Sequence, residues 1–232
     1  MFQQTQQTQN VVTGVSSNIP RKALSMLPVS NTGQGDDSKQ KINVKKYPSG
    51  NIVRIAAIPD GSCLIHSTVK AFLEDYARSD YNNRRNIAKL IRQEMAARLM
   101  VRKDGKTFYE TFANGSWLSL AIQQYIGKVR NEPSFGFDAG LKELQDKFLS
   151  DGYLGDESFN YLSYIIRFKI IIVMGYTDDI EFVVATEDFN YDKCIVILGN
   201  GAHYELVGEI INGQTKTIFD INDPFITSIV KK

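Results

Sequence analysis

The chain has 232 residues, of which 43% are hydrophobic and 23% are charged, so it carries enough apolar surface for one sizeable core. Its formal net charge of +1 argues against nucleic-acid binding, which depends on many Lys and Arg side chains that neutralise phosphates. The longest apolar run is far too short to span a bilayer. We therefore expect a soluble, monomeric protein that has neither nucleic acid nor a membrane as a partner.

The first part of the chain, residues 1–40, is rich in Gln, Ser, Thr, Gly and Asn and lacks a sustained apolar pattern. Such a segment cannot offset the entropy lost on ordering, so we predict a flexible lead-in over residues 1–40 and one folded domain over residues 41–232. A short apolar patch at residues 23–27 could still dock on that domain or bind a partner. The absence of a signal peptide and the presence of only two cysteines favour a reducing, cytoplasmic location.

The first half of the domain has mainly helical patterns. A short strand at residues 51–55 leads through the turn Pro59-Asp60-Gly61 to Cys63 and a helix at residues 67–76. Further helices are expected from a cap at Asn82 or Asn83 to Arg102, at residues 117–129 and at residues 139–149. The first of these three carries a predicted core stripe of apolar residues, namely Ile87, Leu90, Ile91, Met95, Leu99 and Met100.

The second half of the domain has the pattern of short strands rich in Ile, Val and Phe. They are predicted at residues 169–174, 181–185, 194–198, 203–208 and 215–219. The pair Asn212-Gly213 is typical of a two-residue hairpin turn, which would join the last two of these strands. Helices followed by a run of strands favour an α+β fold.

Cys63 is the candidate nucleophile. It follows Asp60-Gly61-Ser62 and lies at or just before the N-terminus of a predicted helix, where unpaired amides and the helix dipole favour an anion. This setting is expected to lower the pKa of the thiol and to leave the amides of Gly61, Ser62 and Cys63 free to bind an oxyanion. Cys194 lies within an apolar strand pattern instead, and we expect it in the core.

A thiol nucleophile needs a base, and the chain has only two histidines, His66 and His203. His66 shares the first turn of the cysteine helix, so it is poorly placed to approach the thiol from across a cleft, and we expect a packed or surface position for it. His203 follows Gly201-Ala202, small residues that let a substrate backbone come close. The sequence therefore predicts His203 as the base that later protonates the leaving amine.

Three segments of the chain resemble segments of the ovarian-tumour (OTU) family of cysteine proteases. The run Asp60-Gly61-Ser62-Cys63-Leu64 is similar to the nucleophile motif of that family, and His203-Tyr204-Glu205 is similar to its histidine motif. Between them, the run from Gly152 to Leu162 is similar to the helix that precedes the family's central strand. The resemblance spans residues 45–210, with the same order and spacing, and concordant motifs reinforce one another.

The resemblance implies a papain-like OTU fold, in which helices flank a central, mostly antiparallel sheet. It also implies a deubiquitinase, a thiol isopeptidase that hydrolyses the bond between the ubiquitin C-terminus and a lysine. Its partner would be ubiquitin, polyubiquitin or a ubiquitin-like modifier, and it would need no metal and no other cofactor. Gly201, Ala202 and Tyr204 would contact the substrate. For a viral member, the expected location is the host cytoplasm or the virion.

The third catalytic residue stays open, because the chain departs from the family's pattern. The family usually carries Asn or Asp two residues after the histidine, where this chain has Glu205; on a strand, residues two apart share a face. Asp60 is the alternative, either to orient His203 or to anchor the oxyanion loop, and Asn200 is a weaker option. The family also often has Phe-Arg after Cys-Leu, and Ile65-His66 at that place is expected to alter helix packing rather than chemistry.

Two other functions fit the same residues. The first is a thiol protease that processes a polyprotein or another peptide. The second is a ubiquitin-binding module that keeps the fold but has weak turnover or none, and Glu205 in place of Asn or Asp favours this second alternative.

Overall fold

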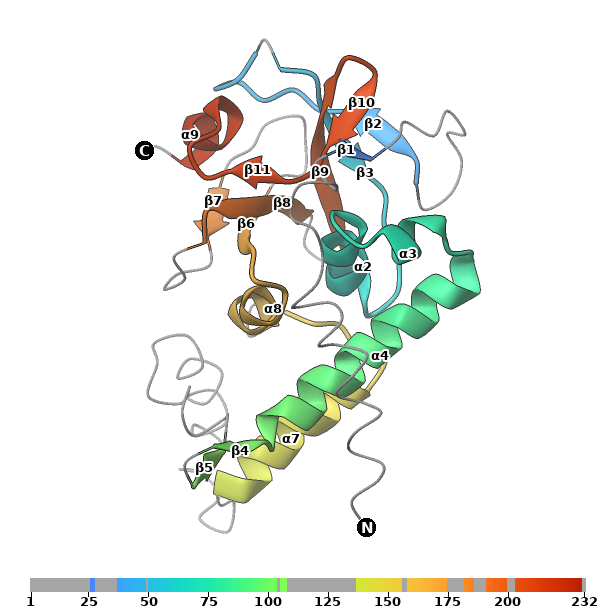
Figure 1. Ribbon diagram of the computed structural model, residues 1–232, viewed down its shortest axis with the longest axis vertical. Helices are drawn as coiled ribbons and strands as arrows, with labels where there is room; N and C mark the ends of the chain where they lie inside the picture. The colour runs from blue at the N-terminus through green and yellow to red at the C-terminus, as the bar shows by residue number, and fades with distance from the viewer. Residues whose placement is uncertain are drawn as a thin grey trace.

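The fold is described here from a computed structural model, which defines residues 26–27, 37–48, 50–103, 105–107, 137–155, 158–174, 182–185, 191–199 and 203–230. These residues form a mixed sheet with helices on both of its faces, and a pair of long helices extends away from the sheet (Figure 1). Within this part of the chain, no helix is both long and apolar enough to cross a membrane.

The sheet is mostly antiparallel. Its strands are β1 (Met26–Leu27), β2 (Lys39–Lys41), β3 (Ile52–Ile55), β6 (Lys169–Met174), β7 (Phe182–Ala185), β8 (Lys193–Gly199), β9 (Tyr204–Ile211), β10 (Gln214–Lys216) and β11 (Phe219–Asp220). The main order is β1-β10-β9-β8-β6-β7, while β3 also pairs with β9, β2 with β3, and β11 with β8. Of the described pairs in this sheet, β6 with β8 is parallel and the others are antiparallel. The predicted α+β fold with a mostly antiparallel sheet is therefore confirmed.

The central strands are apolar on both faces because both faces are covered. Ile170 and Ile172 of β6 belong to the core on the side of the long helices, whereas Ile171 and Val173 belong to a second core beneath the C-terminal helix. Buried strands of this kind have continuous apolar runs rather than alternating ones. The sequence-based bounds for β6 are correct for the same reason.

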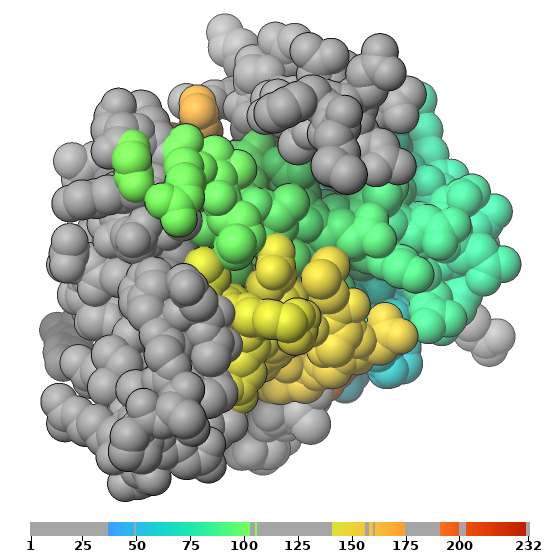
Figure 2. Space-filling model, turned by 90° about the horizontal axis from the view of Figure 1, so that it is seen from below, coloured from blue at the N-terminus to red at the C-terminus, as the bar shows by residue number. Residues whose placement is uncertain are grey.

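The helices are α2 (Cys63–Lys70), α3 (Glu74–Arg78), α4 (Tyr81–Leu99), α7 (Phe137–Leu149), α8 (Phe159–Ile166) and α9 (Pro224–Val230), and β4 (Arg102–Lys103) pairs with β5 (Lys106–Thr107) after α4. Figure 2 shows α4 (green) lying against α7 (yellow) on one face of the molecule. The Tyr161 hydroxyl of α8 donates to the Met95 carbonyl of α4 at 2.7 Å, so α8 is tied to the same pair. This helical layer holds the loop before α2, since Arg92 of α4 donates to the Gly61 carbonyl.

Several predicted bounds are wrong in the helical half. The helix expected at residues 67–76 begins at Cys63 and breaks after Lys70, so that α2 and α3 are separate. The cap of α4 is Asp80, whose carboxylate accepts the Asn83 amide at 2.8 Å, rather than Asn82 or Asn83. The helix expected at residues 117–129 lies outside the described residues.

The buried face of α4 also differs from the predicted stripe. Leu90 and Met100 are exposed, whereas Arg84, Arg92 and Glu94 are buried. Leu90 and Arg92 are two positions apart, which places them on nearly opposite sides of a helix. The buried face therefore keeps Ile91, Met95 and Leu99 of the predicted stripe and also takes in polar side chains. Arg84 and Arg92 have partners in other segments, and Glu94 pairs with Arg98 one turn along the same helix.

The Asn212-Gly213 hairpin is confirmed. Both residues have positive φ, 51° and 79°, as a type I′ turn requires, and β9 pairs with β10 across the turn. The strand expected at residues 215–219 divides, however, because β10 ends at Lys216 and β11 leaves to pair with β8.

The start of the folded domain lies earlier than the predicted residue 41. Asp37 forms ion pairs with two buried cations, at 2.9 Å to Lys70 Nζ of α2 and at 2.8 Å to Arg84 Nη2 of α4. Lys39 and Gln40 already belong to β2, and the β1 backbone pairs with β10. Residues 37–40 are thus part of the domain, and Met26 and Leu27 of the apolar patch pair with β10. The flexible lead-in stays a prediction for residues 1–25 and 28–36, which lie outside the described residues.

We expect Asp37→Asn to lower the free energy of unfolding by about 1–3 kcal/mol. This range lies between that of an exposed pair and that of a buried pair, because the Asp37 side chain is 39% exposed while both of its cations are buried. Burial raises the pKa of Asp37, but the hydrogen bonds and charges of Arg84 and Lys70 outweigh burial and leave the pKa lowered.

The sign of the pH dependence follows from this lowered pKa. The stabilisation is present above the unfolded-state pKa of about 4 and is lost as the pH falls through the lower folded-state value. Urea unfolding at pH 7 and near pH 3 should show a difference between wild type and Asp37→Asn that shrinks in acid. Asp146→Asn is the control, since the Lys142–Asp146 pair is exposed and spans one helical turn. Equal effects of the two substitutions would contradict the anchoring role of Asp37.

Candidate active site

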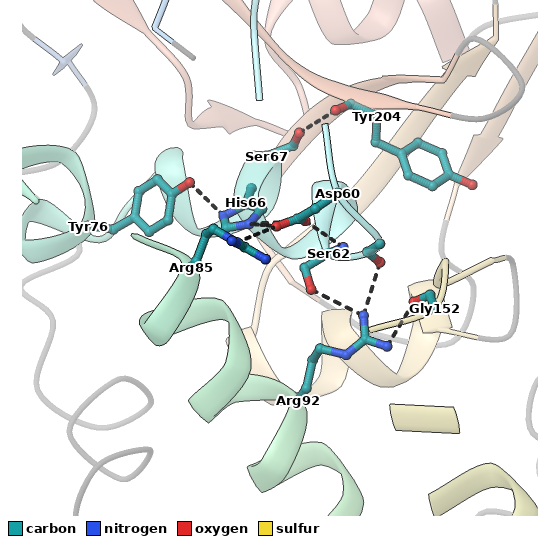
Figure 3. Close-up of polar contacts among 10 residues, drawn as sticks. Asp60, Ser62, His66, Ser67, Tyr76, Arg85, Arg92, Gly152 and Tyr204 are labelled. Carbon is teal, nitrogen blue, oxygen red and sulfur yellow. Dashed lines mark hydrogen bonds and ion pairs between the residues drawn. The ribbon is translucent and has the colours of Figure 1, made fainter. Parts of the chain in front are cut away.

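Cys63 is the first residue of α2 and lies beside the first residue of β9. The Tyr204 backbone lies close enough to the Cys63 sulfur to act against the rise in the pKa of the thiol. The Ser67 hydroxyl, one turn along α2, donates to the Tyr204 carbonyl at 2.8 Å (Figure 3). Because His203 directly precedes Tyr204 in the chain, the fold brings the candidate nucleophile to the segment that carries the candidate base.

The pKa of the Cys63 thiol is raised, which differs from the predicted lowering. Burial is the main cause, since Cys63 is only 1% exposed. Backbone hydrogen bonds of Tyr204, Leu64 and Cys63 itself act in the opposite direction, and the Asp60 carboxylate adds to the rise. The helix start therefore does supply favourable amides, but burial outweighs them.

The loop before α2 folds around Asp60. The Ser62 amide donates to Asp60 Oδ1 at 2.8 Å, and the Cys63 amide donates to the Asp60 carbonyl at 3.1 Å. Gly61 is required here by close packing, because a Cβ at this position would lie 1.9 Å from the Asp151 carbonyl oxygen. Of the three predicted oxyanion donors, those of Ser62 and Cys63 are thus bound within the loop, and Asp60 holds them there.

Asp60 also makes contacts away from the thiol. Its carboxylate oxygens lie 3.3 Å from His66 Nε2, and one of them lies 3.4 Å from Arg85 Nε. On the other side of the buried His66 ring, Nδ1 lies 2.8 Å from the Tyr76 hydroxyl (Figure 3). Both ring nitrogens of His66 therefore have partners, which matches the packed position expected for this histidine.

Glu205 is the other residue that could orient the His203 ring, and its side chain points toward β3. Its Oε2 lies 3.2 Å from Arg54 Nη1, without the alignment of a hydrogen bond. Leu206 and Tyr204 belong to the core that contains Cys63, so the alternation along β9 turns Glu205 toward the opposite face. His203 lies just before β9, so the shared-face argument for His203 and Glu205, which assumed a strand from residue 203, does not apply.

The predicted substrate contacts divide into two groups. Gly201 and Ala202 lie outside the described residues, as does Asn200. Tyr204 is buried, with its ring stacked on Tyr153 at 5.4 Å and meeting Phe159 edge-on at 5.5 Å. The exposed ring of this stack belongs to Tyr153. Sequence reasoning placed Tyr153 in a family-like helix motif and missed its position against Tyr204.

Arg92 is a second residue that the sequence did not single out. It projects from α4 toward the loop that contains Gly61 and Ser62 and contacts Gly152 on the other side (Figure 3). No sequence signal marks it, because its partners are mostly backbone carbonyls from segments distant in the chain.

The remaining chemistry-bearing side chains are inert or dispersed. Cys194 is buried, donates to the Phe219 carbonyl at 3.6 Å, and has its pKa raised by burial to about 12. This agrees with the core position predicted for it. Among the described residues, no three His, Cys, Asp or Glu side chains gather into a group that could hold a metal ion.

Comparison with known proteins gives matches by structure only. No protein-family model and no curated protein matches the chain. Several solved structures are similar to it, and they are OTU domains. An OTU domain in complex with ubiquitin is 16% identical, with 84% of this chain and 89% of that chain covered and a TM-score of 0.47. The viral OTU domain protease from Farallon virus is 18% identical (74% and 89% covered, TM-score 0.48), and the Hazara virus OTU bound to ubiquitin is 13% identical (82% and 98% covered, TM-score 0.45).

Proposed function

We propose that the protein is a cysteine-type deubiquitinase of the OTU type, with Cys63 as the nucleophile and His203 as the base. The observation that carries the proposal is the meeting of α2, which begins at Cys63, and β9, where the Ser67 hydroxyl donates to the Tyr204 carbonyl and His203 comes directly before Tyr204. A thiol at a helix start beside a histidine-bearing segment is the arrangement that nucleophilic acyl transfer needs. Ubiquitin as substrate rests on the resemblance of three segments to OTU motifs.

The chemistry proceeds in two acyl-transfer steps. Because burial raises the pKa of Cys63, the thiol keeps its proton in the resting protein, and His203 receives that proton as the sulfur attacks the ubiquitin C-terminal carbonyl carbon. His203 then gives the proton to the lysine amine, which leaves while a thioester remains on Cys63. In the second step His203 takes a proton from water as the water oxygen attacks the thioester carbonyl carbon. The C–S bond then breaks, His203 returns the proton to the Cys63 sulfur, and ubiquitin leaves with a free C-terminal carboxylate.

Accommodation of the oxyanion requires a change at Asp60. The amides of Ser62 and Cys63 already donate to this residue, so the developing negative charge competes with Asp60 for them. We therefore assign Asp60 first to the shaping of the oxyanion loop. The orientation of His203 falls to Glu205 or Asp60, and Tyr153 joins Gly201, Ala202 and Tyr204 as a contact for the ubiquitin tail.

A ubiquitin that carries a C-terminal electrophile tests the proposal directly. The wild-type protein should form a one-to-one covalent adduct through Cys63, identified by mass spectrometry of the modified peptide. A short peptide with the same electrophile is the control, because a general peptide protease would react with both equally. Ubiquitin that binds without forming an adduct would instead support the binding module, which the burial of Cys63 favours as the second candidate. Absence of both binding and adduct would refute the deubiquitinase and the module alike.

A further inference from the structure

Arg92 of α4 donates to two segments that lie far from it and from each other in the sequence, namely residues 61–62 and residues 147–152. Its Nη1 donates to the Gly61 carbonyl at 3.0 Å and to the Ser62 hydroxyl at 3.2 Å. Its Nη2 donates to the Gly152 carbonyl at 2.8 Å, and further bonds reach the end of α7, at 2.8 Å from Nε to the Phe148 carbonyl and at 3.1 Å from Nη2 to the Lys147 carbonyl. Only a guanidinium offers five donors in one rigid plane for such a set of acceptors.

From this geometry we infer that Arg92 is a positioning residue, which holds the oxyanion loop of Cys63 in its working orientation. The inference rests on the proposed function and deepens it, since it assigns the support on which the nucleophile loop depends. Arg92 itself contacts backbone and a loop hydroxyl rather than a reacting atom, so it acts through the loop.

The orientation of the Gly61–Ser62 peptide explains why the contacts of Arg92 with this loop matter. In a trans peptide the carbonyl and the N–H point in opposite directions. The bond from Arg92 to the Gly61 carbonyl therefore turns the Ser62 N–H away from Arg92, where it meets Asp60. If this peptide flipped, its carbonyl oxygen would face Asp60 in place of the N–H, and the loop would lose an amide for which a developing oxyanion could compete. Arg92 thus holds the polarity of the loop as well as its position.

The other contacts make Arg92 a rigid support. Lys147 and Phe148 lie in the last turn of α7, where carbonyls lack partners within the helix, so the guanidinium caps α7 while it holds the loop. On the far side, the packing of Gly61 against the Asp151 carbonyl leaves the loop little room to shift. Arg92 is only 2% exposed. Asp60, Asp151 and the Cys63 thiol lie near enough to interact electrostatically with its guanidinium.

Arg84 provides a matched control on the same helix. It is 5% exposed and donates to two backbone carbonyls near the end of α3, Tyr76 at 3.1 Å and Ala77 at 2.8 Å. Arg92→Lys and Arg84→Lys thus each replace a buried guanidinium that binds the end of a helix, with the positive charge kept. The Arg92 contacts reach the oxyanion loop, whereas those of Arg84 reach Asp37 and the end of α3.

The experiment compares both variants with the wild type in two ways. Steady-state hydrolysis of a fluorogenic ubiquitin C-terminal amide gives kcat and KM, and hydrogen exchange gives the protection of the amides at residues 60–63. Lysine has three donors on a flexible stem and cannot span the five acceptors. Arg92→Lys should therefore lower kcat roughly 10-fold to 100-fold, a smaller loss than the removal of an oxyanion donor causes. The KM should stay within about 2-fold of the wild-type value. Exchange at residues 60–63 should accelerate as well.

Each outcome decides the inference. Arg84→Lys should keep kcat within about 3-fold and leave exchange at residues 60–63 unchanged, even where its thermal midpoint falls as much as that of Arg92→Lys. An Arg92→Lys protein that matches Arg84→Lys in both kcat and loop exchange would overturn the positioning role. If the wild type does not hydrolyse ubiquitin amides, the proposed function fails, while hydrogen exchange still decides whether Arg92 holds the loop.

Discussion

Cys63→Ala should abolish hydrolysis of ubiquitin conjugates, with a loss in kcat on the order of 10⁴-fold or more, whereas Cys194→Ala should stay within about threefold of wild type. Both cysteines are free and buried, so the pair of variants is matched in chemistry and in burial. Their surroundings differ. Cys63 has helix-start amides and the Tyr204 backbone at its sulfur, whereas Cys194 has an apolar strand and the Phe219 carbonyl. The measurement is cleavage of a panel of linkage-defined diubiquitins, with circular dichroism to show that both variants fold.

The raised pKa of Cys63 adds a pH signature to this prediction. In the free protein the thiolate is scarce at neutral pH, so alkylation of Cys63 by iodoacetamide should be slower than that of a free cysteine. Its rate should rise about tenfold per pH unit until the pH passes the raised pKa, since only the thiolate reacts. The measurement is made in the Cys194→Ala background. Retained turnover in Cys63→Ala would end the assignment of the nucleophile, and fast, pH-independent alkylation below pH 8 would contradict a protonated resting thiol.

The sequence predicted best those parts of the fold that depend on local patterns. The bounds of β6 followed from a β-branched run, and the turn after β9 followed from the residues that tolerate positive φ. The position of Cys63 at a helix start followed from the Asp-Gly-Ser that precedes it, because short polar residues and glycine favour turns and helix caps. These features are determined by a few neighbouring residues, so a single sequence is enough to find them.

The features that the sequence did not predict depend on partners far along the chain. Arg92 is not among the residues of the predicted apolar stripe, yet it is buried and donates to acceptors at Gly61, Phe148 and Gly152. Asp37 lies in a polar segment of the sequence, and its ion pairs with two buried cations, one from α2 and one from α4, bring it into the domain. The thiol pKa was misjudged for a related reason. Helix-start amides are visible in a sequence, whereas the depth of burial that outweighs them arises only from tertiary packing.

His203→Ala should lower kcat by roughly 10³–10⁴-fold, because the base that accepts the thiol proton must also protonate the leaving amine. His66 is the control, and the structure makes His66→Gln a better choice than His66→Ala. The buried His66 ring bonds to the Tyr76 hydroxyl and to Asp60, so an alanine would leave a buried hydroxyl without this partner and loosen the oxyanion loop. Glutamine can keep part of these bonds, and His66→Gln should remain within about tenfold of wild type.

Imidazole in the buffer, together with the two carboxylate variants Glu205→Gln and Asp60→Asn, completes the test of His203. Added imidazole should restore part of the activity of His203→Ala and should do nothing for Cys63→Ala, because a small base can replace the lost ring but not the nucleophile.

If Glu205 orients His203, then Glu205→Gln keeps a hydrogen bond but loses the charge that stabilises the imidazolium, and kcat falls substantially. Asp60→Asn should instead change kcat together with the exchange of the Ser62 amide, since the Asp60 carboxylate accepts that amide, whereas the Cys63 amide keeps its acceptor, the Asp60 backbone carbonyl. A His66→Gln variant that is inactive while His203→Ala turns over normally would reverse the assignment of the base.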